Sequence, residues 1–228
     1  HGNVRKTDMK AALGTLAVFV MSWLLISVAV GLKNVFVLRI SGAGSYISAV
    51  VATAVLLFAF AVYFANTERI RMDRIRELAA VVGVLTVSVI LNVYLSILSV
   101  YLMPIALSAF IVVSLSNSRD SFACNLMSNL MTGVILLLEV IKLPIESVSD
   151  TVMPIVAILA AGTASGALVS FFLGGETRRL MYIGKGLLIG LASAGILSAV
   201  SAARGEAAGW VLTYRVVCAL VQVLAAQL

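Results

Sequence analysis

Ionisable and sulfur-containing side chains are scarce in this chain of 228 residues. Only 11% of the residues are charged, and the one histidine is His1, in a terminal His-Gly-Asn that is typical of a cleavage scar. No internal imidazole is therefore present to act as a metal ligand, general base or proton shuttle. The two cysteines, Cys124 and Cys218, both lie in apolar runs and are interpreted as small core residues. We expect no active site, no metal and no cofactor in this chain.

Apolar residues are abundant instead. They make up 62% of the chain, and the mean hydropathy is +1.13. This composition excludes a soluble domain, a disulfide scaffold and a disordered tail, because each of these needs more polar surface or more cysteine. The apolar residues form continuous runs rather than short alternating segments, which favours transmembrane helices over β-strands. The sequence thus predicts an all-α polytopic membrane helix bundle.

The lengths of the apolar runs predict about eight transmembrane helices, because a helix needs about 20 apolar residues to cross the bilayer core. The run from Leu78 to Ser116 is too long for one crossing. Pro104 is its one helix breaker, so we expect a turn at 102–104 and a short helix after Pro104 that ends near Leu115, followed by a polar turn at 116–120. The expected longer spans are 11–32, 46–65, 78–101, 121–141, 152–174, 183–203 and 210–228.

The lysine and arginine residues predict the orientation of these spans. With alternating crossings, eleven of them fall on one side of the membrane and four on the other. The positive-inside rule then places both termini in the cytoplasm. We expect a multi-pass protein of the bacterial inner membrane whose main partner is the lipid bilayer. Nucleic-acid binding is not expected, because the basic residues are divided among the flanking loops.

Several segments resemble a known family. Residues 101–106, Tyr-Leu-Met-Pro-Ile-Ala, open the short helix, and a polar turn with Arg119 and a helix with Ala123 come after it. An arginine-rich connector covers 69–77, and Thr-Arg-Arg at 177–179 precedes a helix with several glycines. These stretches are similar to the membrane domain of the seven-transmembrane-HD proteins, the PgpH type of cyclic-di-AMP phosphodiesterase. The resemblance covers about 46–228.

The resemblance implies a domain organisation. Residues 1–10 would be a cytoplasmic tail with the scar at 1–3, 11–32 the family's lone first helix, and 46–228 its seven-helix domain. Only 33–45 stands where the family has an extracellular domain, and no His-Asp motif of the HD hydrolase domain is present. The chain would then be a fragment, an engineered minimal version or a relative that lost its sensor module.

The function implied by the resemblance is a non-catalytic sensor or anchor that relays a signal to a cytoplasmic HD phosphodiesterase domain, located beyond Leu228 in the same polypeptide. The family's catalytic residues have no counterpart here. Two alternatives stay open: a substrate-binding subunit of a vitamin-type transporter, and a membrane scaffold of the MreD type. The native gene downstream of the Leu228 codon distinguishes them, because only the first function requires an HD domain there.

Polar residues inside the expected spans are candidate sites, because polar groups are costly in the bilayer. Asn125 and Asn129 share a helical face that should point into the bundle, where they form either a helix–helix hydrogen bond or a ligand contact. Asn92 is open to the same two interpretations. Arg215 either reaches the outer interface or binds an anionic group. These four residues form the candidate ligand-binding set.

Two further features concern packing. Glu139 follows an apolar run, and we expect it to pair with Lys142 at the membrane rim. The small-residue ridges Gly162-xxx-Gly166 and Gly186-xxx-Gly190 allow helices to approach closely. We interpret them first as packing seams within the chain, with a homodimer seam as the alternative.

Overall fold

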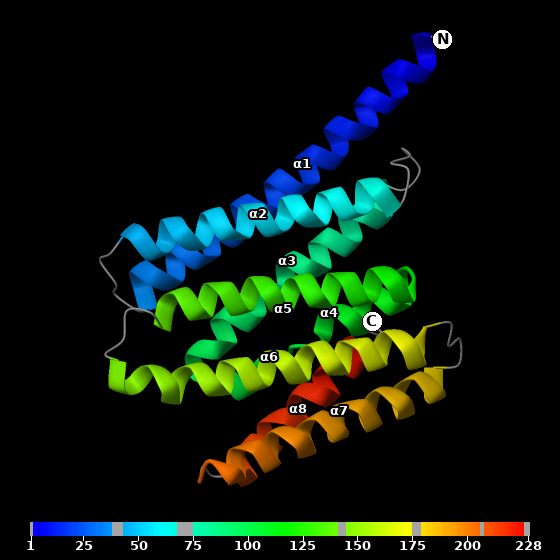
Figure 1. The fold of residues 1–228 in the computed structure, drawn as a ribbon. Helices are drawn as coiled ribbons and strands as arrows, with labels where there is room; N and C mark the ends of the chain where they lie inside the picture. Colours follow the sequence, from blue (N-terminus) through cyan, green and yellow to red (C-terminus); the bar gives the residue numbers. More distant parts are fainter. Residues whose placement is uncertain are drawn as a thin grey trace.

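The computed structural model describes residues 2–37, 43–67, 75–140, 145–174, 179–205 and 208–225. Within these ranges all regular structure is helical, which confirms the predicted all-α fold (Figure 1). The eight α-helices are α1 (Gly2–Leu32), α2 (Ala43–Thr67), α3 (Ile75–Leu98), α4 (Leu107–Leu115), α5 (Ser118–Val140), α6 (Ile145–Leu173), α7 (Arg179–Ala203) and α8 (Ala208–Ala225). A π-helical segment, η1 (Lys33–Val37), continues α1, and a 3₁₀ turn, η3 (Val100–Leu102), follows α3.

Six of the described helices are long and apolar enough to cross a membrane: Ala12–Phe36, Gly44–Asn66, Ile75–Leu98, Ser118–Val140, Thr151–Leu173 and Met181–Ala203. Two shorter apolar stretches, Val100–Leu115 and Gly209–Leu224, complete the bundle. Successive long helices run back and forth between two ends of the molecule (Figure 1). The chain is therefore a multi-pass membrane protein.

The short helix α4 lies at the centre of the bundle. It contacts α3, α5, α6 and α8, and residues 107–110 are all buried. One apolar core packs α1, α2 and α3 against α5, a second packs α4 against α6, α7 and α8, and a third surrounds the segment between α3 and α4. Helices α4 and α5 thus join the N-terminal and C-terminal parts of the molecule.

The first helix is longer at both ends than the sequence predicted. Residues 2–10 were expected as a tail, but they continue α1, which projects past its neighbours at the N-terminus (Figure 1). No proline interrupts this stretch, so nothing in it stops the helix. At the other end, Lys33 was expected to begin an external loop, and it is instead a buried residue of η1.

The boundary between α4 and α5 also differs from the prediction. The expected polar turn at 116–120 is shorter, because α5 already begins at Ser118. Asn117 caps this helix: its Oδ1 accepts a hydrogen bond from the backbone N–H of Asp120 at 2.8 Å, and its Nδ2 donates to Asp120 Oδ2 at 2.9 Å. This reciprocal cap satisfies a donor that the first helical turn would leave unpaired. The connector at 69–74, Lys142 and residues 177–178 lie outside the described residues.

The orientation with both termini in the cytoplasm stays a prediction, and thiol labelling tests it. Leu115 at the end of α4 and Ala203 at the end of α7 are both exposed. In spheroplasts, a membrane-impermeant maleimide should label an Ala203→Cys variant and leave Leu115→Cys unlabelled until the membrane is opened. The unmodified chain is the background control, because Cys124 and Cys218 are buried. The opposite labelling pattern would reverse the orientation.

Candidate functional site in the polar interior

The helical backbone is broken between α3 and α4, where a 3₁₀ turn and an extended residue separate the two helices. Pro104 has no N–H and disfavours helical geometry at the preceding residue, and Met103 accordingly adopts an extended conformation (φ −63°, ψ 125°). Ser99 caps η3 by accepting the N–H of Tyr101 at 3.2 Å. Met103 and Ile105 are almost fully buried. The break therefore places carbonyl groups inside the bundle without the usual helical partners.

Helix α8 supplies donors to these carbonyls. Arg215 Nη1 donates to Met103 O at 2.6 Å and to Tyr101 O at 3.4 Å, while Cys218 Sγ donates to Leu102 O at 3.0 Å. Arg215 is only 3% exposed. Irregular backbone is tolerated inside a membrane helix bundle when its polar groups are paired within the protein. A cation is also favourable at the carbonyl end of a helix. Arg215 therefore faces the bundle rather than the outer interface, where it donates to backbone carbonyls, and its binding of an anionic group stays a prediction.

Asn125 links three helices. Its Oδ1 accepts a hydrogen bond from Ser108 Oγ of α4 at 3.0 Å, and its Nδ2 donates to Gly162 O of α6 at 3.0 Å. One turn earlier on α5, Ser121 Oγ donates to Ala109 O of α4 at 2.9 Å and contacts Ser170 Oγ of α6 at 2.8 Å. These contacts fix the rotation of α5 against its two neighbours, as interhelical hydrogen bonds do in membranes.

The two other asparagines of the candidate set are not saturated in this way. Asn92 Nδ2 donates to Thr132 Oγ1 at 3.4 Å, but Asn92 Oδ1 has no partner among the described residues. Asn129 is buried, and neither atom of its amide group has a partner within that part of the chain. The structure thus does not bring the four candidate residues together as one site: both amide atoms of Asn125 are paired with the chain's own groups, while Asn92, Asn129 and the Nε of Arg215 retain unused hydrogen-bonding capacity among the described residues.

The four ridge glycines face other helices of the same chain. A Cβ on Gly162 would lie 2.7 Å from Ile105 Cβ, and one on Gly166 would overlap the Asn125 amide. A Cβ on Gly186 would lie 2.8 Å from the ring of Phe110, and one on Gly190 would overlap Ala219. Both ridges are therefore occupied by intrachain packing around α4, α5 and α8, and the homodimer stays a prediction that needs another surface.

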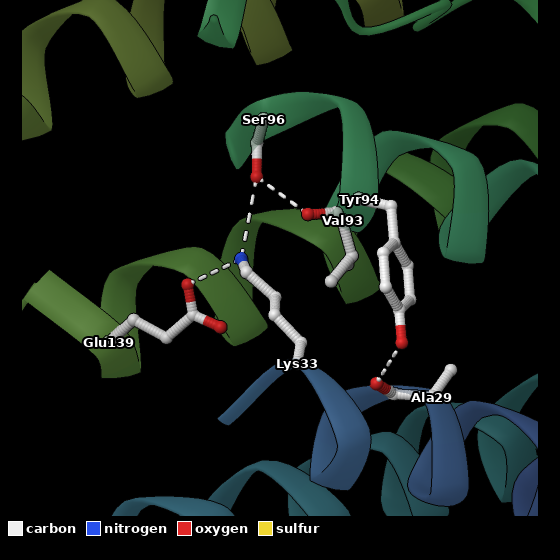
Figure 2. Close-up of polar contacts among 6 residues, drawn as sticks. All are labelled: Ala29, Lys33, Val93, Tyr94, Ser96 and Glu139. Atoms are coloured by element: carbon white, nitrogen blue, oxygen red, sulfur yellow. Dashed lines mark hydrogen bonds and ion pairs between the residues drawn. The ribbon is translucent and has the colours of Figure 1, made fainter. Parts of the chain in front are cut away.

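An ion pair at the end of α1 was not predicted. Lys33 Nζ lies 2.7 Å from Glu139 Oε2 of α5 and donates to Ser96 Oγ of α3 at 3.4 Å (Figure 2). The Lys33 side chain is 2% exposed and that of Glu139 is 15% exposed. Beside the pair, Tyr94 OH donates to Ala29 O at 2.9 Å. Glu139 thus pairs with Lys33, because η1 carries the lysine inward to the end of α5, while the expected partner Lys142 lies outside the described residues.

A second polar cluster, also missed from the sequence, lies where α5 begins. Asp120 is buried and accepts hydrogen bonds from Ser116 Oγ at 3.1 Å and from Tyr63 OH of α2 at 3.5 Å. The guanidinium of Arg119 lies 5.6 Å from the centre of the Tyr63 ring, within cation–π range. The capping pattern Asn-x-x-Asp before an apolar run was the sequence signal for this cluster.

These contacts describe a polar interior built for helix association and hydrogen bonding. Among the described side chains, no group of three His, Cys, Asp or Glu residues is placed to hold a metal ion. No family model, curated protein or solved structure matches the chain. The functional interpretation therefore depends on the geometry of the interior and on the family resemblance of the sequence.

Replacing Arg215 tests the role of the carbonyl contacts in stability. We expect Arg215→Met to lower the free energy of unfolding by about 2–3 kcal/mol, because hydrogen bonds to charged groups are each worth about 1.5–3 kcal/mol and the freed carbonyls stay buried. Arg215→Lys should lose less, since it keeps one charged donor. The measurement is denaturant unfolding in detergent. Exposed Arg76 of α3 provides the matched control, and an equal loss in Arg76→Met would contradict the assignment.

The Lys33–Glu139 pair is tested by a double-mutant cycle. Lys33→Met should destabilise the protein by about 3 kcal/mol, the lower end of the range for breaking a buried pair, because Glu139 is partly exposed. Adding Glu139→Leu should restore most of the loss, because it removes the unpaired carboxylate. Strictly additive effects of the two substitutions would show that the residues do not interact.

Proposed function

We propose that the chain is the membrane domain of a cyclic-di-AMP phosphodiesterase of the seven-transmembrane-HD type. In this proposal it is non-catalytic and acts as a sensor or anchor that relays a signal to a cytoplasmic HD domain beyond Leu228 in the parent polypeptide. The observation that carries the proposal is the contact of Arg215 and Cys218 with the carbonyls of 101–103. This contact connects residues 101–103, in the segment with the strongest family resemblance, to α8, the last helix before the proposed catalytic domain.

The same contact supports a relay rather than a passive anchor. Helix α4 is enclosed by α3, α5, α6 and α8, so a shift of α4 must be accommodated by its neighbours. Because α8 is tied to the break by Arg215, it would follow such a shift. In the proposed orientation α8 runs toward the cytoplasm, so its displacement would be passed directly to the HD domain. A coupled element of this kind is what signal transfer between distant sites requires.

A small-molecule transporter or receptor subunit is the second candidate. The unused hydrogen-bonding groups of Asn92 and Asn129 favour it, because buried polar groups in membrane proteins commonly mark substrate pathways. The pairing of Asn125 with Ser108 and Gly162 O, and of Arg215 Nη1 with Met103 O, favours the relay instead. The MreD-type scaffold has no contact in its favour beyond the helical bundle itself.

Expression of the complete open reading frame tests the proposal. Membrane vesicles carrying the parent protein should hydrolyse cyclic-di-AMP, whereas the purified 228-residue chain should not, since it has no internal histidine. In the parent, Arg215→Met should change the hydrolysis rate several-fold at equal protein level, and Arg76→Met should not. An open reading frame without an HD domain, or vesicles without hydrolysis, would refute the proposal; ligand uptake by those vesicles would favour the transporter.

A further inference from the structure

Near the middle of the neighbouring helices α3 and α5 lie four buried polar residues that we call the midplane polar layer: Ser88 and Asn92 of α3, and Ser128 and Asn129 of α5. Each is at most 2% exposed. Five of their atoms have no hydrogen-bond partner among the described residues, namely Ser88 Oγ, Asn92 Oδ1, Ser128 Oγ, Asn129 Oδ1 and Asn129 Nδ2. Buried polar groups in folded proteins are nearly always paired, so this concentration in one layer needs an explanation.

The register of α3 against α5 brings the two serines to the same level. Cys124 Sγ contacts Val81 O at 3.7 Å, and farther along both helices Asn92 bonds Thr132, so the helices run in the same direction (Figure 1). Ser88 and Ser128 each lie four residues, or one helical turn, before the members of the Asn92–Thr132 contact. The two hydroxyl groups therefore face each other's helix directly below that contact.

Asn129 extends the layer toward α6. Its Nδ2 lies 3.0 Å from the position that a Cβ on Gly162 would take, so the amide group is directed at the glycine seam. Ile105, from the break before α4, borders the same seam. The amide thus stands between α5, α6 and the break, where an alanine in place of Gly162 would crowd it.

The unused atoms define the chemistry of a bound group. The amide oxygens of Asn92 and Asn129 need donors, Asn129 Nδ2 needs an acceptor, and the serine hydroxyls accept either. No charged side chain belongs to the layer; on α5 the nearest acidic residues are Asp120 and Glu139, nine and ten residues from Asn129. A cation without a counter-charge is strongly disfavoured at this depth. The layer therefore suits a neutral group that both donates and accepts hydrogen bonds.

We propose that the midplane polar layer is a binding site for such a neutral group, supplied either by water or by a hydroxyl or amide of a small ligand. A water molecule with about three polar partners is the usual occupant of a buried polar site. A small ligand would use the same hydrogen bonds. The proposal of this binding site does not depend on the proposed coupling to an HD domain, and it stands whether or not that domain exists.

Solid-state NMR of the ¹⁵N-asparagine-labelled chain in deuterated lipid tests the site. Asn125 is the internal control, because its amide lies one turn away on α5 and is saturated by Ser108 and Gly162. In water-edited spectra, polarisation transfer from water to Asn129 Nδ2 should be several-fold stronger than transfer to Asn125 Nδ2. Asn129→Leu, or Asn129→Thr if the leucine variant does not fold, assigns the signal by its loss.

Perdeuteration of the protein separates the two sources of the bound group. Transfer from water protons to Asn129 Nδ2 identifies water, and transfer from non-exchanging protons, which the deuterated protein and lipid lack, identifies a small ligand. Either result supports the site. An Asn129 amide that receives no more transfer than Asn125 from either proton source would overturn the proposal.

Discussion

The backbone carbonyls of residues 101–103 impose the constraint on which the rest of the bundle depends. They belong to a broken stretch in which Met103 is fully buried and Tyr101 and Leu102 are partly buried, and an unpaired carbonyl in an apolar interior is strongly unfavourable. Arg215 and Cys218 pair them from α8. That requirement holds α8 against the break, and α7, which packs extensively on α8, is held with it. The C-terminal part of the bundle is thus placed by hydrogen bonds to one irregular segment, while the apolar cores fill the space around it.

Helix α5 organises the other helices because it carries polar contacts along its whole length. Asp120 bonds α2, Asn125 bonds α4 and α6, Thr132 accepts from α3, and Glu139 pairs with Lys33 at the end of α1. Of the six long spans described, it is the least hydropathic and the most buried. Apolar packing alone gives little specificity between helices in lipid, so these directional contacts determine which helices neighbour α5 and in what register.

The sequence alone was sufficient to predict the fold class, because the lengths of the apolar runs and the position of Pro104 are local properties of the chain. The pairing of Lys33 with Glu139 was not found, since the residues are 106 positions apart and the lysine was expected in a loop. One signal existed: opposite charges end two spans on the same predicted side of the membrane. For Arg215 there was none, because its partners are backbone carbonyls, which every residue has. Asn125 and Asn129 share a helical face, yet only the packed neighbours determine which of them is saturated.

Asn125 and Asn129 differ in hydrogen bonding, and this difference distinguishes a residue that fixes the helix packing from one that can rearrange. A paired amide such as Asn125 resists movement, because displacing it would break its hydrogen bonds to Ser108 and to Gly162 O in the buried interior. Asn129 lies one turn away, beside the break and Gly162. It has no hydrogen bond among the described residues to lose when its surroundings rearrange. Helix α4 has nine residues and spans about 14 Å, roughly half of the hydrocarbon core, so the break completes the crossing. The unpaired amide of Asn129 therefore borders the irregular segment before α4, because Asn129 and Ile105 both contact the same glycine of α6, Gly162.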